Sequence, residues 1–236
     1  RTYCVDTVRS AMERGSGQRL NCPGCESPSS DWNAVEGLQY ARCGVCGTLV
    51  LRNIPAATEW AGVLIQVSQQ RNSPSTLDSS IVQSRAENVY EPKLEWIHNT
   101  LRLQGVSRPR LIEVTTPPSP FTRLLLESPF FGPVTTVVEG QLMQSSSSPV
   151  ATAEAAVLLE SLDRSNDPAE MLQSTGRLLN SGGLLFLTAL VCSGFDMVVL
   201  GAQNMYLYPP DRANCFSLSG LEKLLVRTGY RPVELS

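Results

Sequence analysis

The sequence predicts an α/β fold, in which a doubly wound and mostly parallel sheet follows a small cysteine-rich N-terminal domain. From residue 108 onward, short apolar segments typical of buried strands alternate with amphipathic segments of helical length, which indicates βαβ units. Before that point, two Cys-x-x-Cys pairs lie in a segment too short to form a large core of its own. We therefore divide the chain into a tail with the cysteine-rich domain at 1–52, a linker with helices at 53–104 and an α/β domain at 105–236.

Outside the cysteine pairs, residues 1–104 contain two segments that predict helices and one that predicts ordered structure. TYCVDTVRSAMERG, residues 2–15, predicts a short helix, and ATEWAGVLIQV, residues 57–67, predicts an ordered apolar segment. Residues 81–104 predict a further helix, because three apolar side chains share one face at helical spacing. These side chains are Leu94, Ile97 and Leu101.

The α/β domain is expected to alternate strands with helices in a regular order. The predicted strands are RLIEV (110–114), VTTVVEG (134–140), EAAVLLESL (154–162), GLLFLTAL (183–190) and RPVELS (231–236). The predicted helices are PFTRLLLES (120–128), DPAEMLQSTGRLLN (167–180) and SLSGLEKLLVRTGY (217–230), the last with Ser217 or Ser219 as its cap. A low-complexity loop is expected at 143–152, and the apolar run 195–200 is also interpreted as a buried strand.

The cysteine pairs carry the most specific signal in the sequence. CPGC and CGVC form the pattern Cys-x2-Cys-x17-Cys-x2-Cys. Two such knuckles place four thiolates at the corners of a tetrahedron, about 2.3 Å from one Zn²⁺. Four unrelated cysteines or a redox pair are the alternatives, but two pairs at this separation favour metal. We predict a structural zinc ribbon with the ligands Cys22, Cys25, Cys43 and Cys46.

Composition argues against several classes of protein. A net charge of −3 and the absence of any Lys/Arg-rich run predict that the chain does not bind nucleic acid. We expect no membrane span, since no apolar stretch reaches the ~18 residues that one needs, and no signal peptide. The chain has seven cysteines, an odd number, which together with the metal-like pairs predicts a reducing, cytoplasmic location. The other three, Cys4, Cys192 and Cys215, are expected to be small buried side chains.

In the order of its segments the chain resembles the class I S-adenosylmethionine (SAM)-dependent methyltransferases with an N-terminal zinc ribbon, which are common among sugar- and polysaccharide-modifying enzymes. The resemblance covers roughly 20–236. It rests on the ribbon, on RLIEV and VVEG as the first two strands, on DPAEMLQSTGRLLNSGGLLFLT and on YPPDRANCFSLSGLEKLLVRTGYRPVELS. It implies a Rossmann-like methyltransferase fold, SAM as cofactor, and two cofactor-binding acids that follow these strands, Glu113 and Glu139.

Three stretches depart from the family's pattern where its chemistry would occur. The family's Gly-x-Gly-x-Gly turn reads Thr115-Thr116-Pro117-Pro118-Ser119 here, and these side chains are expected to block a family-like pose of SAM. The family's Glu-His-x-x-Asp-Pro loop reads ESLDRSNDP, and its Pro-Pro-x-His-x-Asn reads PPDRAN, with Arg212 in the place of the histidine. The only histidine, His98, is expected to be a surface or packing residue, so we assign no catalytic residue.

These departures predict a degenerate methyltransferase-like protein, a pseudoenzyme with structural zinc that acts as a scaffold or as the partner of another protein chain, identical or different. The first alternative is an active SAM-dependent methyltransferase on a nucleotide-linked sugar or another small molecule. The second alternative is a zinc-ribbon interaction module in a larger assembly. Two apolar stretches are then candidate contact surfaces, SPFFGP (128–133) and NMYLYPP (204–210).

Overall fold

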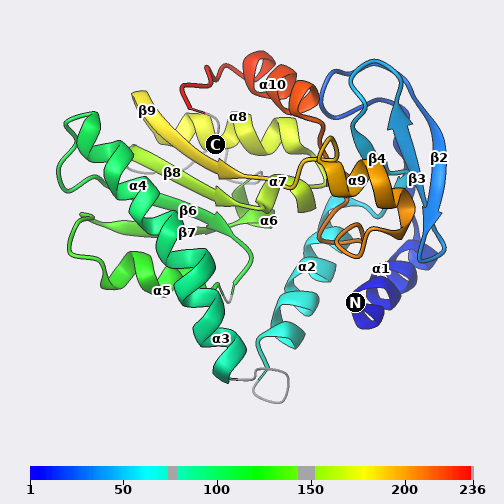
Figure 1. Ribbon diagram of the computed structural model, residues 1–236, viewed down its shortest axis with the longest axis horizontal. Coiled ribbons are helices and arrows are strands. Elements are labelled where there is room, and N and C mark those ends of the chain that lie inside the picture. Colours follow the sequence, from blue (N-terminus) through cyan, green and yellow to red (C-terminus); the bar gives the residue numbers. More distant parts are fainter. Residues whose placement is uncertain (74–78, 118, 143–151, 235–236) are drawn as a thin grey trace. The chain divides into compact units, whose positions relative to one another are not determined.

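The computed structural model describes residues 1–73, 79–117, 119–142 and 152–234 (Figure 1). The chain forms two compact units, which we describe separately. Unit 1 comprises Arg1–Leu64, Glu160–Gly176 and Thr188–Ser236, and unit 2 comprises Ile65–Leu159 and Arg177–Leu187. Pro118 of the predicted turn and most of the predicted low-complexity loop at 143–152 lie outside the described residues.

Unit 1 contains an antiparallel sheet of four short strands. In spatial order these are β10 (Asn214–Cys215), β4 (Leu49–Leu51), β3 (Leu38–Cys43) and β2 (Ser29–Val35). A second, two-stranded sheet pairs β1 (Gly17–Gln18) with β5 (Asn53–Ile54). The four-stranded sheet therefore combines three strands of the cysteine-rich segment with one from the C-terminal part of the chain.

Six further elements complete unit 1 or extend from it. They are α1 (Thr2–Arg14), α7 (Ser161–Arg164), α8 (Pro168–Leu178), α9 (Phe195–Leu200), the 3₁₀-helix η2 (Gly201–Gln203) and α10 (Leu218–Arg227). The predicted first helix is confirmed, and it buries Val5, Val8 and Ala11 at helical spacing. The predicted cap of α10 is confirmed at Ser217, whose Oγ accepts a hydrogen bond from the Gly220 N–H at 2.9 Å.

Unit 2 is built on a sheet with the spatial order β7 (Val134–Val138), β6 (Leu111–Thr115), β8 (Ala153–Leu159) and β9 (Leu179–Thr188). β6 pairs in parallel with both β7 and β8. The chain moves from β6 to a neighbour on one side and then places β8 and β9 on the other side, which is the order that defines a doubly wound sheet. The predicted α/β fold class is confirmed.

Helical segments complete unit 2 or extend from it, and those within the predicted helices at 81–104 and 120–128 confirm these two predictions. They include α2 (Ala57–Arg71), α3 (Ser79–Arg85), the π-helical η1 (Ala86–Tyr90), α4 (Glu91–Leu103), α5 (Pro120–Glu127) and the short α6 (Glu139–Leu142). Ile97 and Leu101 of α4 and Phe121 of α5 share a core cluster with Val157 and Phe186 of the sheet. Burial of each such side chain contributes about 1.5–3 kcal/mol to stability.

Two sequence predictions are wrong. Residues 195–200 form α9 rather than a buried strand, and most of the apolar side chains of this helix are exposed. Five apolar residues and one aspartate between two glycines do not distinguish a strand from one and a half helical turns. Residues 231–234, the described part of the predicted C-terminal strand, lie in no strand, and Pro232 lacks the N–H that a strand ladder requires. Within the described residues, no helix is both long and apolar enough to cross a membrane.

Candidate functional site

The four predicted zinc ligands come together in unit 1. The sulfur atoms of Cys22, Cys25, Cys43 and Cys46 all lie within 4.8 Å of one another. The shortest separations are 3.5 Å between Cys22 and Cys46 and 3.4 Å between Cys25 and Cys43. A tetrahedral site with zinc–sulfur bonds of about 2.3 Å has sulfur–sulfur distances of about 3.8 Å, so the cluster has close to the dimensions of a zinc site.

Both cysteine knuckles orient their backbone toward the sulfurs. The Gly24 N–H donates to Cys22 Sγ at 3.3 Å, and the Cys46 N–H donates to Cys43 Sγ at 3.5 Å. Burial would raise the pKa of Cys25, but hydrogen bonds with Ser27 outweigh it and lower this pKa to about 6. A lowered pKa favours the thiolate, which is the form that binds metal.

The C-terminal helix α10 lies directly against this cluster. A Cβ at Gly24 would lie 2.8 Å from the Gly220 carbonyl oxygen, so the first knuckle and the helix touch through two glycines. At the other end of α10, Arg227 donates to the carbonyl oxygens of Pro23 and Gly24 and forms an ion pair with Glu26 at 2.8 Å. The ribbon is thus fastened to the C-terminal helix at both ends of that helix.

Glu113 lies within β6, two residues before the strand ends, and is only 3% exposed. Its carboxylate accepts hydrogen bonds from Ser119 Oγ at 3.1 Å and from Thr122 Oγ1 at 2.5 Å. Burial raises the pKa of Glu113, and the two hydroxyl groups lower it in part. One carboxylate oxygen is therefore held by Ser119 of the predicted turn and the other by Thr122 of α5.

The Thr/Pro turn and Glu139 lie at the carboxyl edge of the sheet in unit 2, where ligands bind in doubly wound folds. Thr115 pairs with Val138 in the β6–β7 register, so Thr116 and Glu139 leave the sheet at adjacent strand ends. Thr115, Thr116 and Glu139 are all buried, whereas Pro117 is exposed. The cofactor-binding roles of Glu113 and Glu139 stay predictions.

A second polar group in unit 1 joins two stretches that depart from the family pattern. Arg212 forms ion pairs with Asp163 at 3.3 Å and with Glu160 at 3.5 Å. Asp163 is fully buried, and the oxygen that faces Arg212, Oδ2, also accepts a hydrogen bond from the Leu190 N–H at 2.9 Å. Burial raises the pKa of Asp163 to about 7, although Arg212 lowers it. We call these three residues the acid–arginine cluster. The sequence pointed to Arg212 as the residue in the place of a histidine, and nothing in it indicated that Arg212 meets Asp163.

His98 packs between aromatic rings, which confirms its predicted packing role. The centroids of Phe130 and Phe131 lie 4.6 Å and 5.0 Å from the centroid of its ring, and its Nε2 lies 3.1 Å from Ser128 Oγ. Burial lowers the pKa of His98, and the neighbouring Arg102 lowers it further. Phe131 is buried, so the predicted contact surface 128–133 is in part core.

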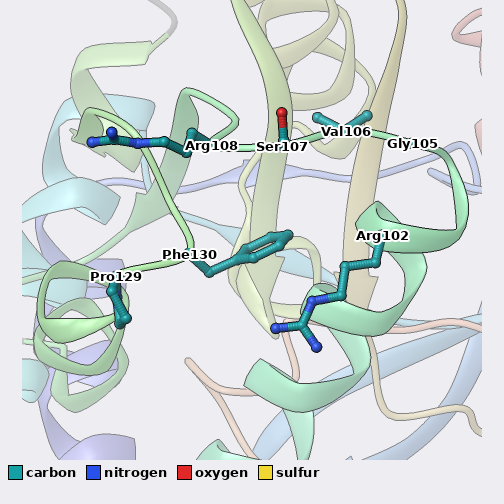
Figure 2. A pocket seen from close by; sticks show the side chains of 7 residues that line it. All are labelled: Arg102, Gly105, Val106, Ser107, Arg108, Pro129 and Phe130. Atoms are coloured by element: carbon teal, nitrogen blue, oxygen red, sulfur yellow. The ribbon is translucent and has the colours of Figure 1, made fainter.

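Near His98, unit 2 has a hollow of about 400 Å³. It is lined by Arg102, Gly105, Val106, Ser107, Arg108, Pro129 and Phe130. These residues precede β6 and β7, so the hollow lies at the amino edge of the sheet, opposite to the edge where ligands bind in such folds. Figure 2 shows that Arg108 points away from Arg102, so the two cations do not converge on one ligand.

Comparison with protein-family models gives no match, and comparison with curated protein sequences gives none. Among solved structures, the chain is similar to a SAM-dependent methyltransferase of Thermotoga maritima described as a possible histamine N-methyltransferase, with 15% identity over 64% of this chain and 81% of that chain and a TM-score of 0.39. It is also similar to the plantazolicin methyltransferase BpumL in complex with SAH, with 11% identity over 73% of this chain and 77% of that chain and a TM-score of 0.45. At these values we draw nothing about activity or ligands from the likeness.

Proposed function

We propose that this chain is a methyltransferase-like protein with a closed SAM site, which serves as a scaffold or partner subunit rather than as a catalyst. The observation that carries the proposal is the engagement of Glu113 by Ser119 and Thr122. The acid that would face the cofactor turn is instead tied to that turn and to the helix after it.

The chemistry of the turn supports the same proposal. A family-like site needs a glycine backbone that passes close to the cofactor without side chains. Here Thr115 and Thr116 are buried, and Pro117 has no N–H to donate. Opening the segment to admit a ligand would leave the buried Glu113 carboxylate without hydrogen bonds, which costs about 1–3 kcal/mol or more.

The zinc ribbon would give such a scaffold its rigidity. We propose that Cys22, Cys25, Cys43 and Cys46 bind one Zn²⁺, whose closed coordination by four thiolates is structural and not catalytic. The binding free energy of the metal then contributes to the folding of unit 1, including the contact with α10. The odd number of cysteines and the metal-like spacing of the two pairs support the reducing, cytoplasmic compartment that we propose. Elemental analysis should find one zinc per chain.

Titration calorimetry of the zinc-loaded protein with SAM and with S-adenosylhomocysteine tests the closed site. We expect no binding at millimolar ligand, which corresponds to a free energy weaker than about −4 kcal/mol. A circular dichroism spectrum of the same sample confirms that the protein is folded. A micromolar Kd, about −8 kcal/mol, would refute the proposal.

An active methyltransferase is the second candidate, favoured by the position of Glu139. This acid follows β7 directly, at the carboxyl edge of the sheet, where the family's acid binds the ribose hydroxyls. In that case SAM binds in the titration, and Glu139→Ala abolishes the binding. Unchanged SAM binding by Glu139→Ala would count against this candidate.

A further inference from the structure

A continuous stretch of unit 1 exposes large apolar side chains to solvent. We call it the α9 surface; it consists of Phe195 (84% exposed), Val198 (75%), Val199 (61%), Leu200 (46%), Met205 (62%) and Tyr206 (57%). Together these side chains expose roughly 700 Å², if a fully exposed aromatic side chain offers 150–250 Å² and an aliphatic one somewhat less. Patches of more than about 300–600 Å² on a soluble protein mark interaction sites.

The α9 surface is held in place by buried polar contacts. Asn204 is 1% exposed; its Nδ2 donates to Asp196 Oδ2 at 2.8 Å, and its Oδ1 accepts from the Tyr206 N–H at 2.9 Å. Met197 anchors α9 from its inner side and is 5% exposed. Gly201 of η2, which follows α9, faces the Trp32 ring of β2. These contacts hold the backbone of the α9 surface in place while its apolar side chains stay exposed.

The size and chemistry of the surface fit a second copy of the same chain. A standard interface buries about 800 Å² per partner, and two α9 surfaces together offer roughly 1,400 Å², within the range of stable complexes. In a two-fold dimer each central residue lies near its own counterpart, so charges at the centre repel one another. The only charged side chain within α9 is Asp196, which is bound to Asn204. Homodimer interfaces are also the most apolar class.

We propose that two copies of this chain associate through their α9 surfaces in a two-fold symmetric dimer. This inference deepens the proposed scaffold role by naming the contact that the scaffold makes. It does not depend on the SAM site, because the α9 surface contains none of the residues of the Thr/Pro turn.

Sedimentation of the zinc-loaded chain of 236 residues tests the dimer. At 10–100 µM we expect a species of twice the 25.7 kDa chain mass. Val199→Glu places two carboxylates in the dimer centre and should raise the dimer Kd at least tenfold. The matched control is Val226→Glu, since Val226 also lies on a helix of unit 1 and is 64% exposed against 61% for Val199. The control should dimerise as the wild type does.

Three outcomes would overturn the proposal: a wild-type chain that stays monomeric at 100 µM, a Val199→Glu chain that still dimerises, or equal losses in both variants. The first outcome includes the cases in which a different protein or another part of the same chain covers the surface. Circular dichroism and zinc content distinguish lost dimerisation from lost folding, because both side chains are exposed and neither variant should change them. SAM titration of the same samples reports on the closed site independently of the oligomeric state.

Discussion

The contact between α10 and the cysteine cluster leads to a sharp prediction at Gly220. A Cβ at this position would clash with Thr48 Oγ1 and would lie 3.1 Å from both Cys46 Sγ and Ser217 Oγ. Thr48 Oγ1 accepts a hydrogen bond from the Ser217 N–H at 3.2 Å and lies 3.3 Å from Cys46 Sγ. Gly220→Ala therefore forces the buried Thr48 hydroxyl away from the Ser217 N–H and from Cys46 Sγ. Cys46 is one of the four proposed zinc ligands.

Three contributions determine the expected change in stability, of which the first stabilises the variant and the other two destabilise it. Alanine in a helix is more favourable than glycine by about 1 kcal/mol. Overpacking of a buried site costs about 1–3 kcal/mol, and each displaced hydrogen bond costs about 1 kcal/mol more. We expect Gly220→Ala to lower the free energy of unfolding by about 2 kcal/mol, which lowers Tm by about 4–8 °C in a chain of this size.

Urea denaturation of the zinc-loaded protein, followed by circular dichroism, measures the change in stability, and competition with a chromophoric chelator measures zinc affinity. The control is Gly62→Ala in the interior of α2, where a Cβ meets no atom within 4 Å. Gly62→Ala should raise stability by up to about 1 kcal/mol through helix propensity alone. The reasoning is refuted if Gly220→Ala is as stable as the wild type and binds zinc equally well.

Three further predictions concern unit 1. Arg212→Ala leaves the buried Asp163 carboxylate without its cation, so at pH 8 we expect a loss of about 3–5 kcal/mol in the free energy of unfolding by urea. The raised pKa of Asp163, about 7 against an ordinary 3.8, means that the folded state holds a proton that the unfolded state releases between these values. The free energy of unfolding should therefore fall from pH 4 to pH 7, by at most about 4 kcal/mol, and Asp163→Asn should remove this contribution to the slope. Cys43→Ser should reduce zinc from one per chain to none and broaden the thermal transition; retained zinc would refute the assigned ligand set.

The parts that the sequence predicted well are those whose signal is local. The spacing of the cysteine pairs predicted that the four sulfurs would cluster. Each pair forms a tight turn, so only the distance in space between the two turns could not be predicted. The strands β6 and β8 were clear, because their residues are buried on both faces and almost continuously apolar. The same reasoning failed at 195–200, because an exposed helix with an apolar outer face has no polar stripe to reveal its period.

The acid–arginine cluster brings together two stretches that are far apart in the sequence. In the sequence, ESLDRSNDP and PPDRAN are separate stretches, and each lacks a histidine that the family has. In the structure, Asp163 and Arg212 of these two stretches form one ion pair, and Glu160 joins them. The two stretches therefore form one polar site in unit 1. A buried carboxylate requires a cation, so a change at either stretch constrains the other. Two separate features thus support the proposed closed site, the Thr/Pro turn of unit 2 and the acid–arginine cluster of unit 1. The titration with SAM tests the first of them directly.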